Sequence, residues 1–114
     1  MMESMCNYSK NDYSLDDAFV AVIEPVSSKV DLLDELNAKL HFPYFGFNWD
    51  SLYDLLRDFY WIRQKEINIV HNRLCLSSKD YDIYMSIVNN SERFWLDYPD
   101  EHILKFHING IKKN

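Results

Sequence analysis

Glycine and proline are scarce in this chain, with 2 Gly and 3 Pro among 114 residues. So few turn-forming residues argue against an all-β sandwich or barrel with many tight hairpins. They also leave no GxGxxG or P-loop pattern to bind a phosphate. The longest strongly apolar run, residues 18–23, is far shorter than the roughly 18 residues of a membrane span. No apolar segment follows a basic start at the N-terminus, so we expect neither a secretory signal nor a membrane-bound protein.

Cysteine is almost as scarce, because Cys6 and Cys75 are the two in the chain. Two cysteines do not make a disulfide framework, and neither belongs to a CxxC pair or to a zinc-type Cys/His spacing. With no export signal in view, we expect reduced thiols and a cytoplasmic protein. We also expect no metal and no cofactor.

The composition is that of one globular domain, with 47% hydrophobic and 26% charged residues. Residues 1–14 are polar and without periodicity, which predicts a flexible N-terminal arm before a single domain over residues 15–114. Lys and Arg number 12 against 18 Asp and Glu, a net charge of −6. Direct binding to nucleic acid relies mostly on Lys and Arg contacts to phosphate, so an acidic chain is better suited to a basic partner.

The hydrophobic pattern predicts the element order β, α, α, β, α, β. We interpret this as an α/β fold with a three-stranded parallel sheet and helices packed on it. The first strand is apolar throughout, which is typical of a strand covered on both faces. Ser27 or Ser28 is expected to cap the first helix and Asn48 the second. The third helix is expected to bury Ile83, Ile87, Asn90 and Phe94, with Trp95 as a further member. The predicted strands are 18–23, 67–70 and 102–108, and the predicted helices are 28–41, 48 to about 61, and 80 to about 97.

The second predicted helix carries the strongest functional signal. Asp50, Asp54 and Asp58 follow each other at i, i+4 and i+8, which places them above one another on the side opposite the apolar residues. Aromatic residues flank this row. Carboxylates accept charge-assisted hydrogen bonds from Arg, and rings supply contact area at low entropic cost, so the segment suits a basic protein surface. An ordinary solvated helix face, with the rings packed locally, is the simpler alternative. The flanking rings are those of Tyr44, Phe45, Phe47 and Tyr53.

Residues 42–56, Phe-Pro-Tyr-Phe-Gly-Phe-Asn-Trp-Asp-Ser-Leu-Tyr-Asp-Leu-Leu, resemble the central motif of the barstar family of intracellular ribonuclease inhibitors. The resemblance implies that the helix and its preceding loop plug the active-site cleft of a nuclease, with carboxylates standing in for RNA phosphates. It places Asp54 at the central anchoring position and Tyr53 at the rim. Glu92 is the nearest candidate for an acidic contact that the family has on its last helix. The other contacting positions would be Tyr44, Gly46, Asn48 and Asp50.

The same resemblance implies an immunity protein of a bacterial toxin–antitoxin pair, which binds one basic nuclease toxin and is a monomer when free. Phe45 stands where the family often has Tyr, and the segment 63–66 before the second strand is longer than usual. These departures bear on which toxin is bound. Whether that toxin is an RNase or a DNase stays open.

An enzyme and an adaptor that binds a protein other than a nuclease are two further classes of function. An enzyme would need a base, a nucleophile or a metal site, and His41, His71, His102 and His107 are the candidates. His102 and His107 are five residues apart on one predicted strand, so they would project from opposite faces about 16 Å apart. Asp50 and Asp54 form a carboxylate pair on an exposed helix, and no serine has an elbow motif. We therefore expect no catalytic residues. The remaining alternative is an adaptor on the same scaffold that binds a basic protein other than a nuclease.

Overall fold

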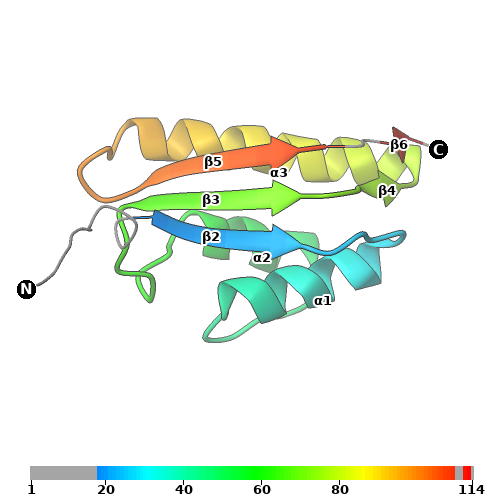
Figure 1. Cartoon of the computed structure of the whole chain (residues 1–114), viewed down its shortest axis with the longest axis horizontal. Helices are drawn as coiled ribbons and strands as arrows, with labels where there is room; N and C mark the ends of the chain where they lie inside the picture. The colour runs from blue at the N-terminus through cyan, green and yellow to red at the C-terminus, as the bar shows by residue number, and fades with distance from the viewer. Residues whose placement is uncertain (1–17, 110–111, 114) are drawn as a thin grey trace, which may run out of the picture.

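Three parallel strands form the central sheet, in the order β2 (Ala18–Ile23), β3 (Glu66–His71) and β5 (Ile103–Ile108) (Figure 1). This computed structural model describes residues 18–109, 112 and 113. The register pairs Ala21 with Ile69 and Ile69 with Phe106. The predicted α/β fold with a three-stranded parallel sheet is confirmed. The predicted arm over residues 1–14, the start of the predicted domain and Cys6 lie outside the described residues.

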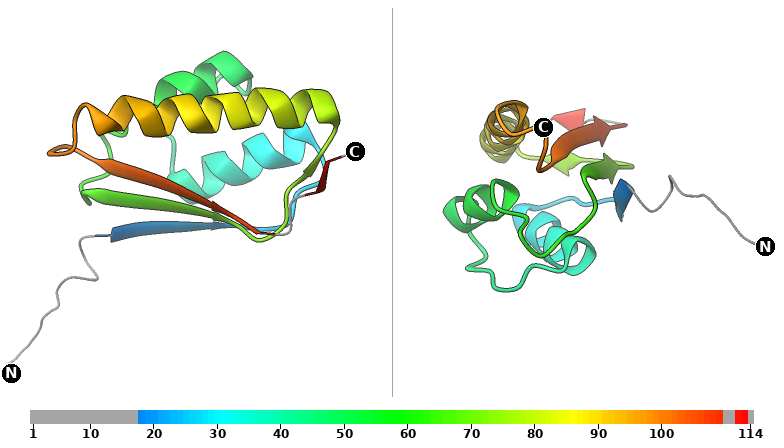
Figure 2. Two further views of the ribbon diagram at one scale, coloured as in Figure 1. Left: turned by 90° about the horizontal axis from the view of Figure 1, so that it is seen from above. Right: turned by 90° about the vertical axis from the view of Figure 1, so that its left-hand side faces the viewer.

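All three helices cover one face of the sheet: α1 (Lys29–Leu40), α2 (Trp49–Leu56) and α3 (Ser78–Leu96) (Figure 2). Right-handed crossovers that progress in one direction along a sheet place every helix on the same side. The expectation that β2 is covered on both faces is therefore wrong, and the side chains of Val20 and Val22 are 56% and 41% exposed. The buried face of the sheet includes Ala21, Ile23, Ile67, Ile69 and Leu104.

Side-chain caps begin the helices. Ser28, one of the two expected candidates, accepts a hydrogen bond at Oγ from the Asp31 N–H, and Asn48 caps α2 as predicted. Ser77 caps α3, which begins two residues earlier than expected. At the other end of α1, His41 takes the left-handed conformation with φ 56°, a common way to end a helix.

The second helix is shorter than predicted, because α2 ends at Leu56 and not near residue 61. Phe59 has φ 50° and its ring is buried between Trp61, Trp95 and His102. The left-handed backbone at Phe59 is incompatible with a continuous helix. Burial of the ring stabilises this turn.

The buried side of α3 also differs from the expected one. Asn90 is exposed and Ile83 is half-buried, whereas Tyr84 and Trp95 are buried because hydrogen bonds satisfy their polar tips. Tyr84 Oη contacts His71 Nε2 at 2.7 Å, and the Trp95 indole N–H donates to the Leu56 carbonyl at 2.8 Å. The buried residues of α3 are Tyr84, Ile87, Val88, Ser91 and Trp95.

A second, very small sheet was not predicted. Its strands β4 (Cys75–Leu76) and β6 (Lys112–Lys113) are parallel and two residues long, which is too short for a period-2 pattern. Among the helices that the structure describes, none combines the length and the apolar character that a membrane crossing requires.

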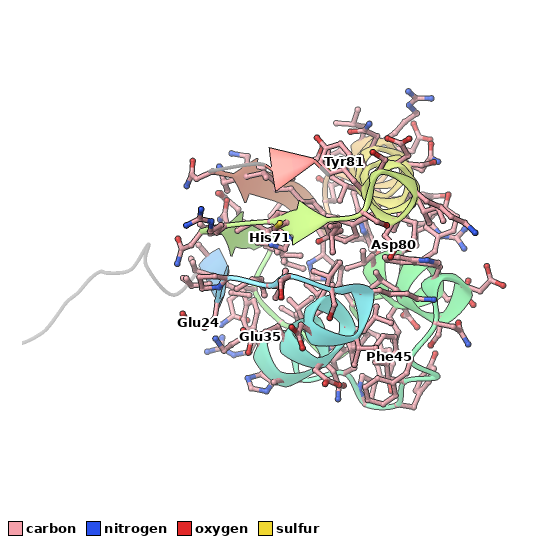
Figure 3. The ribbon with its side chains drawn as sticks, turned by 90° about the vertical axis from the view of Figure 1, so that its right-hand side faces the viewer. Glu24, Glu35, Phe45, His71, Asp80 and Tyr81 are labelled. Atoms are coloured by element: carbon pink, nitrogen blue, oxygen red, sulfur yellow. The ribbon has the colours of Figure 1, made fainter. Side chains whose placement is uncertain are left out.

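Charged side chains from the helices block both edges of the central sheet. On the β2 edge, Lys39 Nζ donates to the Val22 carbonyl at 2.9 Å. Glu35 Oε1 accepts from the Glu24 N–H at 3.0 Å, and both residues are seen in Figure 3. The backbone N–H of Glu24 holds the pKa of the Glu35 carboxyl below its usual value, with a smaller contribution from Lys39. On the β5 edge, Glu92 Oε2 accepts from the Phe106 N–H at 2.8 Å. Unpaired edges invite pairing with another chain, so these contacts protect the sheet.

Candidate protein-binding site

A packed row of aromatic rings holds the loop between α1 and α2. The Phe42 ring lies 5.0 Å from Phe45 and 5.9 Å from Trp61, and Phe45 lies 4.7 Å from Phe47. The Trp61 indole N–H donates to the Leu40 carbonyl at 2.8 Å, which ties the end of α1 to the segment after α2. Tyr44 projects from this loop and is 58% exposed.

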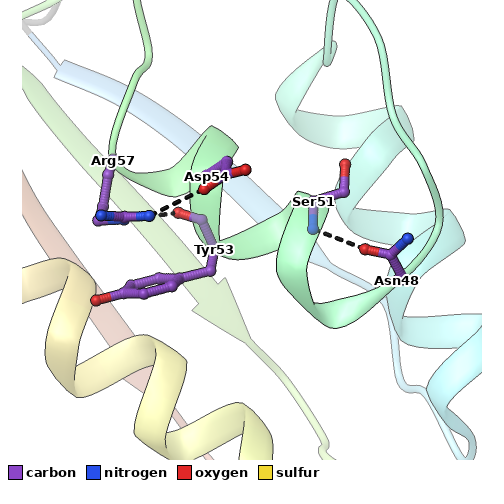
Figure 4. A network of polar contacts seen from close by, with 5 residues as sticks. All are labelled: Asn48, Ser51, Tyr53, Asp54 and Arg57. Carbon is purple, nitrogen blue, oxygen red and sulfur yellow. Dashed lines mark hydrogen bonds and ion pairs between the residues drawn. The ribbon is translucent and has the colours of Figure 1, made fainter.

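The start of α2 is fixed by a reciprocal cap, of which Figure 4 shows the Asn48–Ser51 half. Asn48 Oδ1 accepts from the Ser51 N–H at 2.7 Å, and Ser51 Oγ accepts from the Gly46 N–H at 2.9 Å. A Cβ at Gly46 would lie 3.3 Å from Asn48 Nδ2 and 3.4 Å from Ser51 Cβ, so glycine permits this close approach. Gly46 and Asn48, both expected at the site, thus set the position of the helix N-terminus.

The outer side of α2 presents Asp50 and Asp54, while Leu52, Leu55 and Leu56 are buried. Asp50 lies in the first turn, where the positive end of the helix favours a carboxylate. Asp58 is exposed but lies beyond the helix, because α2 ends at Leu56. The expected i, i+4, i+8 row therefore has two members on the helix and a third in the following turn.

Asp54 is partly neutralised by its own neighbour Arg57 (Figure 4). Arg57 Nη2 lies 2.9 Å from Asp54 Oδ1, its Nε donates to the Tyr53 carbonyl, and its guanidinium lies 3.8 Å from the centre of the Tyr53 ring. The Asp54 side chain is nevertheless 69% exposed, so it remains accessible to another molecule. Within the described part of the chain, neither Asp50 nor Asp58 forms an ion pair.

An open hollow of about 370 Å³ lies between α2 and α3. Its α2 side is formed by Trp49, Asp50 and Tyr53. The α3 residues were not assigned to the site from the sequence; the signal that could have found them is a polar row at 82, 86 and 90, spaced i, i+4, i+8. The α3 side consists of Asp82, Ile83, Ser86 and Ile87.

Glu92 is not brought together with the acidic residues of α2. It lies nine residues, or two and a half helical turns, after Ile83, which places it on the opposite side of α3. Its carboxylate contacts the Phe106 N–H, and it lines a separate hollow with Leu96 and Leu104. Asn90 occupies the side next to the α2–α3 hollow, with its Nδ2 3.4 Å from Ser86 Oγ.

The four histidines lie in different environments. His71 is buried against Tyr84, and burial lowers its pKa from 6.5 to about 4. His102 Nδ1 lies 3.3 Å from the Lys65 carbonyl, whereas His107 contacts Asn68 on the open face of the sheet. His41 is exposed at the end of α1. Over residues 18–109, 112 and 113, His, Cys, Asp and Glu do not gather in threes or more where they could bind a metal ion.

The family model described as barstar (barnase inhibitor) matches residues 17–108. This chain belongs to the barstar family. No curated protein is similar enough to count as a match. Members of the barstar family inhibit ribonucleases and are not enzymes. The match covers all three strands of the central sheet, all three helices and the loop before α2.

Proposed function

We propose that this barstar-family chain inhibits a basic ribonuclease toxin by occupying its active-site cleft. The acidic surface, which we define as Tyr44, Asn48, Asp50, Tyr53, Asp54 and Asp58, makes the contact. The carboxylates take the places of RNA phosphates and accept hydrogen bonds from the arginines and lysines of the cleft. On this proposal the chain is not catalytic, works in the cytoplasm, and pairs one to one with the toxin.

The observation that carries the proposal is the exposure of Asp54 and Asp50 on a helix whose start is rigidly capped. The Gly46–Asn48–Ser51 contacts hold the N-terminus of α2, and the ring contacts of Phe42 with Phe45 and Trp61 hold the loop before it. A surface that is already ordered loses little conformational entropy on binding. The net charge of −6 also favours rapid association with a basic enzyme.

The test is inhibition of RNA cleavage by barnase and by a panel of other basic ribonucleases. The parent chain should abolish cleavage by at least one of them at a one-to-one ratio. Asp54→Ala should weaken binding to that enzyme by about 30-fold or more, as expected when a central charged contact is lost. The melting temperature should hardly change, because Asp54 is exposed.

Asp34→Ala is the matched control, since Asp34 is an exposed residue of α1 outside the acidic surface. It removes the same charge and should change the affinity by less than about threefold. Equal losses for the two variants would contradict a local contact at Asp54. If the parent chain inhibits none of the ribonucleases, the proposed function is wrong and a basic partner of another kind becomes the better explanation.

A further inference from the structure

Among residues 18–109, 112 and 113, three residues other than glycine have a positive φ: His41 at 56°, Phe47 at 54° and Phe59 at 50°. This left-handed region is costly for residues with a Cβ and is unusual for a bulky side chain. Each case therefore needs a compensating interaction. The residues that tolerate this backbone best are glycine and asparagine.

Two of the three are explained by local structure. His41 ends α1, and its N–H donates to the Asn37 carbonyl, which is how a left-handed residue commonly terminates a helix. Phe59 has no exposed surface and packs against Trp61 and Trp95, so burial of its ring offsets the backbone strain.

Phe47 has neither explanation. Phe47 is 50% exposed, and its ring lies 4.7 Å from that of Phe45 in the loop that joins α1 to α2. The left-handed backbone of Phe47 directs the chain towards the N-terminal cap of α2, where Gly46 and Asn48 both contact Ser51. Asparagine or glycine would make that turn with less strain, so the turn does not account for the phenylalanine.

We propose that Phe47 is a partner-contacting residue that helps select which ribonuclease is bound. It stands directly before the cap of α2 and three residues before Asp50, in the same loop as the exposed Tyr44. The ribonuclease selected in this way has an apolar patch on the rim of its basic cleft, and the exposed part of the Phe47 ring packs against that patch. This inference rests on the proposed function and adds an apolar contact to the acidic surface.

The experiment compares thermal stability with affinity for the ribonuclease that the parent chain inhibits, with barnase as the first probe. Phe47→Asn should lower the affinity at least about tenfold, as expected when a ring that packs on the partner is removed. Its melting temperature should equal that of the parent or exceed it by up to about 8 °C, because Asn relieves the strain while half of the ring was exposed.

His41→Asn is the matched control, because it relieves the same backbone strain outside the acidic surface. It should maintain or raise the melting temperature and leave the affinity within about twofold. Phe47→Leu keeps an apolar side chain, and its affinity should lie between those of the parent and Phe47→Asn.

The possible outcomes separate this inference from the proposed function. A fall of several degrees in the melting temperature of Phe47→Asn would make Phe47 a structural residue and overturn the inference. Unchanged affinity in Phe47→Asn, together with a loss in Asp54→Ala, would overturn it while the proposed function stands. A parent chain that inhibits no ribonuclease would contradict both.

Discussion

Arg57 is the residue that most modifies the acidic surface. Its guanidinium pairs with Asp54 and lies 3.8 Å from the centre of the Tyr53 ring, so the free protein already carries one cation among its carboxylates. The Asp54 side chain is 69% exposed and that of Arg57 is 32% exposed, and an ion pair with an exposed partner contributes about 0–1 kcal/mol to stability. The effect of Arg57 should therefore be seen in association more than in folding.

Replacing Arg57 with Gln should accelerate association with the target ribonuclease, because it leaves the Asp54 carboxylate without its neighbouring cation. The association rate should also depend more steeply on salt, since attraction between exposed charges is screened over about 8–10 Å at 0.1–0.15 M salt. Stopped-flow mixing at two salt concentrations measures both effects. Arg63→Gln removes the same charge from an exposed position after α2 and should change the rate less. Slower association of Arg57→Gln would indicate that Arg57 itself contacts the target.

His71 makes stability depend on pH. Its folded-state pKa is lowered to about 4 because it is buried against Tyr84, whereas the unfolded chain binds the proton near pH 6.5. The free energy of unfolding should therefore decrease as the pH falls from 6.5 towards 4, by about 3 kcal/mol in total. Urea unfolding at pH 7, 6 and 5 measures this. His71→Gln should lower stability at pH 7 but remove its share of the slope, and an unchanged slope would contradict the assignment to His71.

At the scale of elements, the α3–β5 contact has a protective function. Glu92 extends from α3 to the Phe106 N–H, which belongs to the outer edge of the sheet. On the other edge, Lys39 and Glu35 of α1 make the corresponding contacts and form an ion pair at 3.3 Å. The helices thus protect both edges of the sheet on which they pack.

Glu92→Ala should destabilise the protein by about 1–2 kcal/mol, because it removes a charged acceptor from a half-buried N–H. It should also increase self-association at high protein concentration, since the β5 edge becomes available for pairing. Chemical unfolding and light scattering measure these effects. Glu101→Ala, in an exposed turn, is the control. We expect Glu92→Ala to inhibit the ribonuclease as well as the parent does. A large loss of inhibition would instead indicate that Glu92 contacts the ribonuclease.

At the scale of the whole molecule, the sheet separates two kinds of surface. The helical side carries the acidic surface. The open side carries Val20 and Val22 on β2, beside a polar network of Glu66, Asn68 and Lys105 on β3 and β5. The Asn68 side chain, more than Lys105, holds the pKa of Glu66 below its usual value.

The sequence predicted the features that depend on local pattern. Strand positions, the Asn48 cap, a cap at Ser27 or Ser28 and the parallel pairing all follow from hydrophobic spacing and capping chemistry. The early end of α2 did not, because it depends on burying Phe59 against Trp95, which is distant in sequence. The position of Glu92 also did not follow from local pattern, because it depends on how α3 is rotated against the sheet. The polar row at 82, 86 and 90 indicates an exposed side of α3, but its contact with α2 depends on the same rotation.

The central claim is that the acidic surface occupies the place of RNA in the cleft of the ribonuclease. The most direct measurement is RNA cleavage at increasing RNA concentration with several concentrations of the Asp54→Ala variant, each in excess over the ribonuclease. The weakened variant is used because an inhibitor that acts at a one-to-one ratio removes free enzyme and lowers the apparent kcat wherever it binds. Our account predicts competition: the apparent KM rises with the concentration of the inhibitor while kcat stays the same. A lower kcat with an unchanged KM would contradict the account, because it would mean that RNA and this protein bind the enzyme at the same time.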